Sequence, residues 1–242
     1  RVDQARFSRP SSPLSQQLST TSPLRIIWAD DALLAVWKPP GMPVQPDPTG
    51  DRDLLAGLRD QLREPGLQLT HRLDRPVSGV VLFGRTPPAT AALNEQFRER
   101  TVRKVYWAVV EGRMVGVRVL EGVVERNART KKARVHRGGG EEATARLHVS
   151  VLALGDRYTL LEVVPDGGAF HQIRAQLAAA GWPIKGDVKY GARRGEKDRS
   201  ILLHARSITF AHPTTSEFIT LVAPVPEGAL WQALAIDAEH PL

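Results

Sequence analysis

Asp74 is a carboxylate whose neighbours could prepare it for chemistry. It lies in the segment 71–79, between Arg72 and Arg75, directly before the apolar run 80–83. Neighbouring guanidinium groups keep a carboxylate ionised and lower its pKa. Such an acid could serve as a nucleophile or a base. An aspartate that only orders a turn is the more frequent case, and these residues alone leave both interpretations open.

A second segment, His171-Gln172-Ile173-Arg174, opens a predicted helix. Ile173 and Leu177 share one face of that helix, so it buries an aliphatic stripe with Arg174 near its edge. A buried arginine needs a carboxylate partner. A distant aspartate is a natural candidate, but helical spacing does not pair the two.

Cations lie beside aromatic residues in a third group. Arg103 and Lys104 precede Tyr106 and Trp107 on a predicted strand, a combination that suits phosphate contact and base stacking. An ordinary strand with a core aromatic residue is the alternative. Residues 126–137 hold six Lys or Arg and no acid before Gly138-Gly139-Gly140, which predicts a basic hairpin with a flexible tip or a solvated loop.

The elements that position these residues follow from hydrophobic spacing and turn signals. We expect strands at 24–28, 33–37, 79–83 and 102–111, alternating runs at 147–151 and 159–163, and two strands around His212-Pro213. Helices are expected around residues 54–62, after Thr86-Pro87, and at 171–180. The pattern predicts an α+β fold with a large, mainly antiparallel or mixed sheet. Residues 1–23 are expected to form a disordered or extended arm, and residues 24–242 the domain.

Composition limits the classes of function. The chain of 242 residues carries a formal charge of +7 and no cysteine, which excludes disulfides and thiolate chemistry. Positive charge favours a polyanionic partner, but a basic protein that has no such partner is an equally open alternative. No apolar run approaches the roughly 20 residues of a membrane span, and no secretory signal is found. We therefore expect a cytoplasmic protein, by default a monomer without an obligate protein partner.

Taken together, these segments resemble the RluA-type family of pseudouridine synthases from about residue 24 to the C-terminus. Five motifs occur in the family's order, and five in one order argue against coincidence. They are Lys38-Pro39-Pro40-Gly41 with Val44; His71-Arg72-Leu73-Asp74 with Ser78-Gly79; Lys104 with Tyr106; His171-Gln172-Ile173-Arg174 with Gly181, Pro183-Ile184, Gly186-Asp187 and Tyr190-Gly191; and Leu203-His204-Ala205 with Phe210 and His212-Pro213.

The sequence departs from the family in two places. The family usually has Thr-Gly-Arg-Thr before the His-Gln pair, whereas Gly167-Gly168-Ala169-Phe170 stand here, so one arginine contact is missing at Ala169. Many members also carry an N-terminal S4 domain that binds RNA, and only about 23 polar residues precede the core here. The catalytic domain is therefore expected to supply most contacts to RNA.

The resemblance implies isomerisation of uridine to pseudouridine in ribosomal or transfer RNA, in an RNA cleft across the sheet, with neither cofactor nor metal. It implies that Asp74 starts the reaction, that Arg174 pairs with it, and that Tyr106 stacks on the uracil and relays a proton. Leu203 would wall the base pocket, while His71 and Arg72 would fill the gap left by the flipped nucleotide. The other implied RNA contacts are Lys38, Lys104, Arg129, Lys131, Lys132, Arg134, His171 and Gln172.

Three rival functions are weighed against this one. A non-catalytic RNA-binding module or RNA chaperone would have no need of a paired acid. A metal-dependent hydrolase could use His71, Asp74 and His171, but no H-E-x-x-H pattern or carboxylate cluster is present. A serine hydrolase built on Ser78 lacks the G-x-S-x-G elbow.

Overall fold

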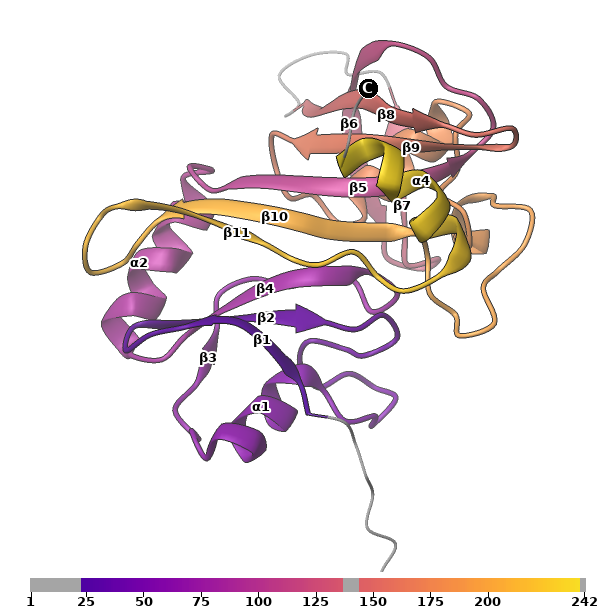
Figure 1. Ribbon diagram of the computed structural model, residues 1–242. Helices are drawn as coiled ribbons and strands as arrows, with labels where there is room; N and C mark the ends of the chain where they lie inside the picture. Colours follow the sequence, from indigo (N-terminus) through magenta and orange to yellow (C-terminus); the bar gives the residue numbers. More distant parts are fainter. Residues whose placement is uncertain (1–22, 137–143, 240–242) are drawn as a thin grey trace, which may run out of the picture.

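A large mixed β-sheet runs through the computed structural model, which describes residues 23–136 and 144–239 (Figure 1). Its eleven strands follow the order β1-β2-β4-β10-β5-β9-β8-β6-β7, with β11 beside β10 and β3 beside β4. The predicted α+β class with a mixed sheet is confirmed. The predicted N-terminal arm, apart from Pro23, lies outside the described residues.

The elements have the following bounds. The strands are β1 Arg25–Ala29, β2 Leu33–Lys38, β3 Gln68–Leu69, β4 Ser78–Gly84, β5 Arg103–Glu111, β6 Val117–Asn127, β7 Lys132–His136, β8 Ala145–Leu154, β9 Tyr158–Pro165, β10 Leu203–Ala211 and β11 Phe218–Val222. The helices are α1 Leu54–Leu62, α2 Pro87–Arg98, α3 Gln172–Ala179, α4 Ala229–Glu239 and the short 3-10 helix η1 Val188–Tyr190.

The helix boundaries follow local capping chemistry. The side chain of Asp53 accepts a hydrogen bond from the Ala56 amide at the start of α1. Thr86 accepts one from the Ala89 amide at the start of α2, where proline follows as predicted. Helix α4 was not predicted, although its buried residues Trp231 and Leu234 have helical spacing.

One parallel pair joins the two halves of the sheet. His204 and Ala205 of β10 lie beside Ser78 and Gly79 of β4, whereas every other named strand pair is antiparallel. A Cβ on Gly79 would lie 2.4 Å from the Ala205 carbonyl oxygen, and Gly79 has φ +127°, so only glycine fits this contact. The strand β4 is thereby held against β10 directly after the loop that carries Asp74.

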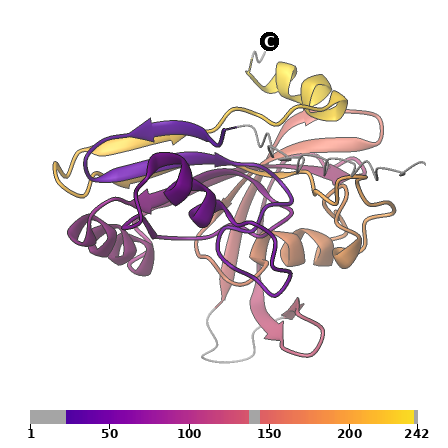
Figure 2. The ribbon, with the colours of Figure 1, turned by 90° about the horizontal axis from the view of Figure 1, so that it is seen from below.

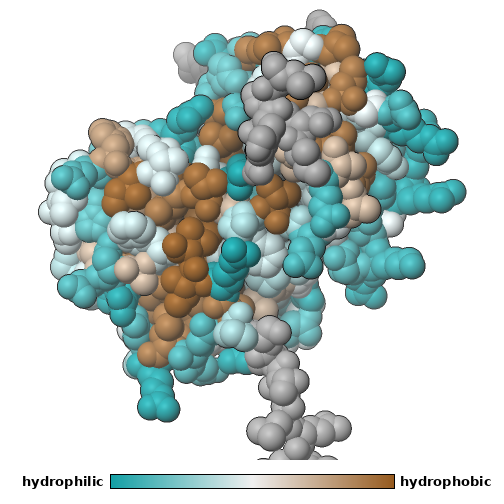
Figure 3. Space-filling view, in the orientation of Figure 1, coloured by the Kyte–Doolittle hydropathy of each residue, from teal (hydrophilic) through white to brown (hydrophobic). Residues whose placement is uncertain are grey.

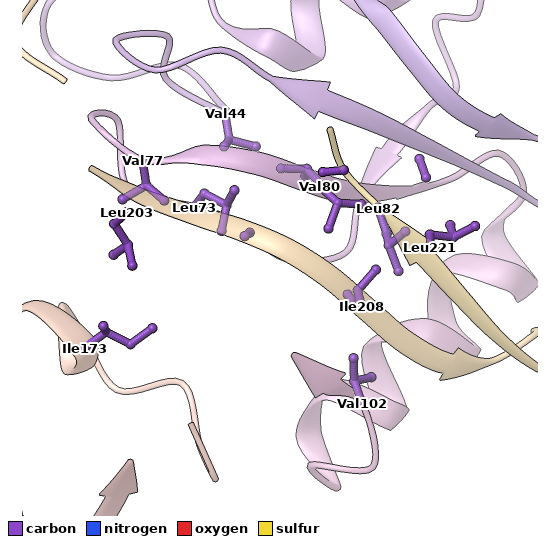
Figure 4. Packing of buried hydrophobic residues seen from close by; sticks show 14 of the residues in the cluster. Val44, Leu73, Val77, Val80, Leu82, Val102, Ile173, Leu203, Ile208 and Leu221 are labelled. Carbon is purple, nitrogen blue, oxygen red and sulfur yellow. The ribbon is translucent and has the colours of Figure 1, made fainter. Parts of the chain in front are cut away.

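Helices α1, α2 and α3 lie on one side of the sheet and α4 lies on the other (Figure 2). The main core extends from under α1 and α2 to the loop before β4. Figure 4 shows Leu73, Val77 and Leu203 close together, with Ile173 of α3 across from them. The apolar core therefore reaches the residues that flank Asp74. A smaller cluster around Trp107, Trp231 and Leu234 anchors α4.

Part of the sheet is left open to solvent. Figure 3 shows apolar residues gathered on the face that includes β1 and β11, where Ile26, Trp28, Phe218 and Val222 are exposed. Among the described residues, no helix is long and apolar enough to cross a membrane.

Candidate active site

Asp74 lies in the loop before β4, at a cleft of about 380 Å³ between that loop, β5 and the start of α3. Its Oδ2 accepts a hydrogen bond of 2.9 Å from Nη1 of Arg174. Its side chain keeps 24% of its surface exposed, whereas that of Arg174 keeps 5%. The ion pair that the resemblance implied is therefore present, while the catalytic role of Asp74 stays a prediction.

Arg174 is held by a second acid that the sequence did not identify as its partner. Nε and Nη2 of Arg174 donate to the two oxygens of Asp187, at 2.7 and 2.9 Å. Burial lowers the pKa of Arg174, but the hydrogen bonds and charges of Asp187 and Asp74 outweigh burial and raise that pKa above its ordinary value. The guanidinium therefore stays charged in a buried position, in a fork geometry that fixes its orientation.

His171 contacts the same carboxylate from another side. The residue before α3 adopts φ +55°, and its Nε2 lies 3.4 Å from Oδ2 of Asp74. Its Nδ1 is 2.8 Å from the Tyr190 hydroxyl, which itself accepts a hydrogen bond from the Ala133 amide. The Tyr190 hydroxyl can therefore donate its proton to Nδ1 of His171. A neutral imidazole has one N–H, so its proton is assigned to Nε2, which faces Asp74.

Burial lowers the pKa of His171 to about 4, although the charge of Asp74 acts in the opposite direction. The imidazole is therefore neutral near pH 7. A neutral imidazole can donate toward Asp74 without adding a second full positive charge beside Arg174.

Tyr106 and Leu203 come from adjacent strands and both line the cleft. Burial, followed by the charge of Asp74, raises the pKa of Tyr106 well above its ordinary value, so the phenol is protonated near pH 7. Leu203 is 3% exposed and adds an apolar wall. The volume of the cleft lies in the range of about 300–1,000 Å³ that is typical of small-molecule sites.

Residues 167–170 form another part of the cleft wall. Nζ of Lys104 donates to the Gly167 carbonyl at 2.7 Å, which ties this loop to β5. The ring of Phe170 stacks on His171 at 3.8 Å between centroids, and the guanidinium of Arg126 lies 4.6 Å over Phe170. Arg126, Phe170 and Tyr190 were not among the predicted site residues. Arg126 belonged to the basic stretch of the sequence, but its place over Phe170 depends on tertiary structure.

The part of the chain that carries this site matches a known protein family. The family model described as RNA pseudouridylate synthase matches residues 32–179, which include Asp74, Tyr106 and Arg174. This chain belongs to the RNA pseudouridylate synthase family. The family that the sequence motifs resembled is thus confirmed.

Relatives of known name support the same assignment over most of the chain. Ribosomal large subunit pseudouridine synthase C of Pasteurella multocida is 33% identical over 240 residues, covering 93% of this chain and 72% of the relative. Ribosomal large subunit pseudouridine synthase D of Xanthomonas campestris is 33% identical over 237 residues, covering 89% and 71%. The solved structure of human RNA pseudouridylate synthase domain containing 4 is 26% identical, with a TM-score of 0.67 and coverage of 84% and 89%.

Lys38, from the first motif of this pseudouridylate synthase, was expected to contact phosphate, and the structure corrects that expectation. The side chain is fully buried, and its Nζ donates to the carbonyls of Pro39, Met42 and Arg75 at 2.8, 2.8 and 3.1 Å. Burial lowers its pKa to about 7. Lys38 therefore holds the loop after β2 against the loop that carries Asp74 and does not reach RNA.

His71 and Gln172, both expected to contact RNA, have hydrogen-bond partners within the protein. The Nε2 atom of His71 accepts a hydrogen bond of 2.9 Å from the Leu82 amide, and its ring stacks on Phe97. Gln172 is buried at the cleft wall, where its amide bonds with the Ala169 amide and the Arg146 carbonyl. Of the pair expected to fill the space of a flipped nucleotide, Arg72 alone is exposed and lines the cleft.

The expected cations Arg129, Lys131, Lys132 and Arg134 are exposed on the β6–β7 hairpin, which projects on the side of α3 in Figure 2. None of the four lines the cleft. The hairpin turns at residues 128–131 and not at the three glycines, which lie outside the described residues. Its strand β7 reaches the site wall through the hydrogen bond between Ala133 and Tyr190.

The rival hydrolase sites find no support in the described part of the chain. Ser78 is bonded to Nδ1 of His204 at 2.9 Å, but both are buried, so no substrate reaches the serine. No group of three potential metal ligands is found among the residues that the structure describes. His71 lies with Phe97 and does not line the cleft that holds Asp74 and His171.

Proposed function

We propose that this protein isomerises uridine to pseudouridine in RNA, with Asp74 as its catalytic residue. The observation that carries the proposal is the attachment of Asp74. A single carboxylate oxygen, Oδ2, is held by a buried arginine that is itself fixed by Asp187. In the described residues, no hydrogen bond joins Oδ1 of Asp74, so this oxygen is available to a substrate.

The reaction suits a site of this kind. The C1′–N1 bond breaks, the uracil turns, and a C1′–C5 bond forms while the proton of C5 is lost and N1 gains one. Atoms and charge balance without a donor or an acceptor of electrons. A carboxylate can attack the sugar, attack C6 of the uracil or remove a sugar proton, and the side chain of Asp74, anchored by Arg174, serves each route.

Tyr106 and Leu203 would hold the base. Tyr106 lines the cleft beside Asp74 and would stack on the uracil, and Leu203 would cover its edge. Because the pKa of Tyr106 is raised, the residue would relay the C5 proton as a neutral phenol that releases its own proton as it accepts another. Arg72, at the cleft mouth, would occupy the space vacated by the flipped nucleotide.

Ribosomal RNA of the large subunit is the substrate class that we propose first, because the two relatives described above are named ribosomal large subunit pseudouridine synthases. Transfer RNA is the second class to test. A cytoplasmic location and a monomeric state belong to the same proposal. Mapping pseudouridine in total RNA from cells with and without the gene identifies the uridine, and the sedimentation velocity of the purified protein gives its oligomeric state.

Release of tritium from RNA labelled at C5 of uridine tests the activity directly. We expect the wild-type protein to release tritium from large-subunit ribosomal RNA transcripts. The isosteric variant Asp74→Asn should release none while binding the same RNA with unchanged affinity. Tritium release by the variant at the wild-type rate would disprove the role of Asp74. RNA binding without any release by the wild type would instead favour the RNA chaperone.

A further inference from the structure

A second hollow of about 410 Å³ adjoins the catalytic cleft, at the junction of α2 and β5. Its lining includes Arg100, Arg103 and Lys104, and it shares Lys104 and Pro165 with the cleft. A chain bound in the cleft could therefore continue into this hollow past Lys104.

The turn between α2 and β5 fixes where the two arginines stand. After the end of α2, Arg100 adopts φ +60°, and its amide bonds to the Phe97 carbonyl at 3.3 Å. The amide and hydroxyl of Thr101 bond to the Gln96 carbonyl. Arg103 is the first residue of β5. The side chains of Arg100 and Arg103 are therefore attached to backbone that is fixed by hydrogen bonds.

The charges of this hollow are not neutralised within the described part of the chain. Arg100 and Arg103 are exposed and have no carboxylate partner there. Burial, followed by the charge of Arg100, lowers the pKa of Lys104, which places like charges close together. The one acid in the lining, Asp166, lies 3.2 Å from Nε2 of His148, and the three cations of the hollow outnumber it. Such a cluster attracts an anion.

A third hollow, beside Gly112, is also basic, but it lies apart from the catalytic cleft. Of its four cations, Lys185 pairs with Glu196 and Arg193 lies 3.9 Å from Glu111, and the other two are Arg157 and Arg194. That hollow also shares no lining residue with the catalytic cleft. The hollow at α2 and β5 is therefore the better candidate for the path of a polyanion.

We infer that Arg100 and Arg103 bind backbone phosphates of the nucleotides next to the target uridine and guide the RNA strand into the cleft past Lys104. This inference rests on the proposed function. No aromatic side chain lines the hollow, so the contact is to phosphate and not to a stacked base. Phosphate contacts position a strand without selecting its sequence.

The salt dependence of RNA binding tests the inference. The probe is a fluorescent, uridine-only RNA oligonucleotide, and the variant is R100Q/R103Q. Each phosphate contact on a single strand contributes about 0.7 to the slope of log affinity against log salt, so two lost contacts should lower the slope by about 1.4. The ratio of wild-type to variant affinity should then shrink about sevenfold between roughly 50 and 200 mM salt.

The matched control is R52Q/R98Q, which removes the same charge from two arginines outside the hollow. Arg52 pairs with Asp60 and Arg98 with Glu95. Equal slopes for R100Q/R103Q and this control would overturn the inference. Thermal melts that coincide with wild type are expected for both variants, because all four side chains are exposed.

Oligonucleotides with one neutral methylphosphonate linkage locate the contact. In the wild type, neutralising a linkage that contacts Arg100 or Arg103 should weaken binding, and R100Q/R103Q should be insensitive to the same substitution. Equal sensitivity of both proteins at every linkage would refute the contact. Binding is measured without turnover, so absent tritium release in the wild type would refute the proposed function alone.

Discussion

Replacing Asp187 with asparagine should damage both folding and activity, although Asp187 does not line the cleft. Asp187 is 2% exposed and accepts two charge-assisted hydrogen bonds from Arg174. The amide of asparagine can accept one of them but turns a donor toward the other N–H. Breaking a buried pair by removing one partner costs about 3–5 kcal/mol. Because one hydrogen bond and the Asp74 charge remain, we expect the lower end, about 3 kcal/mol.

A loss of this size is measurable by thermal or urea unfolding. In a protein of this size each kcal/mol moves Tm by about 2–4 °C, so Asp187→Asn should melt roughly 6–12 °C below wild type. Asp74→Asn is the matched control, since it removes one charge from the other acid on the same arginine. Asp74 is partly exposed and makes one hydrogen bond to Arg174, so its variant should lose less than about 1 kcal/mol.

The two variants should therefore separate stability from turnover. Tritium release should vanish in Asp74→Asn with Tm nearly unchanged, and should fall in Asp187→Asn with Tm clearly lower. Equal melting temperatures for the two variants would show that the buried pair of Asp187 and Arg174 does not stabilise the fold more than the pair of Asp74 and Arg174. Full turnover by Asp187→Asn at a temperature where it is folded would show that Arg174 needs no second acid.

Two further predictions concern the cations of the β6–β7 hairpin and three histidines whose pKa is lowered by burial. Neutralising Arg129, Lys131, Lys132 and Arg134 together should weaken binding to all RNA sequences and lower the salt slope by up to about 2.8, and an unchanged slope would remove the hairpin from the RNA interface. Burial lowers the pKa of His71, His171 and His204 to about 3, 4 and 3, so the unfolded chain binds protons first. The stability that these neutral histidines contribute is fully present above their unfolded pKa of about 6.5. It is lost as the pH falls toward 4, by up to about 1.4 kcal/mol per pH unit for each histidine. Urea unfolding at pH 7, 6 and 5 measures this slope, and a flat profile would contradict the burial of neutral imidazoles.

The sequence predicted the parts of the fold that local rules determine. Thr86 and Pro87 begin α2 as expected because capping depends on neighbouring residues. Helix α4 is not predicted although Trp231 and Leu234 have the right spacing, because the last elements that the sequence predicts are the two strands around His212.

The errors at the site come from contacts between distant segments. Lys38 is expected to contact RNA because the resemblance to the family implies it. Three carbonyls turn inward at that point, and one of them, from Arg75, lies far along the chain. His71 was likewise assigned to RNA, although the Leu82 amide occupies its Nε2 atom. Motifs identify which residues matter together, but they do not say which face a side chain takes.

Asp187 illustrates the same limit and bears on the role that we propose for Asp74. A guanidinium readily forms two parallel hydrogen bonds with one carboxylate. Arg174 directs its paired donors to Asp187 and turns only Nη1 toward Asp74. Were Asp187 absent, Arg174 could take Asp74 in the forked geometry and occupy both of its oxygens. The second acid therefore preserves the charge of Arg174 and also leaves Oδ1 of Asp74 open to substrate, so turnover should depend on Asp187 even in conditions where its variant remains folded.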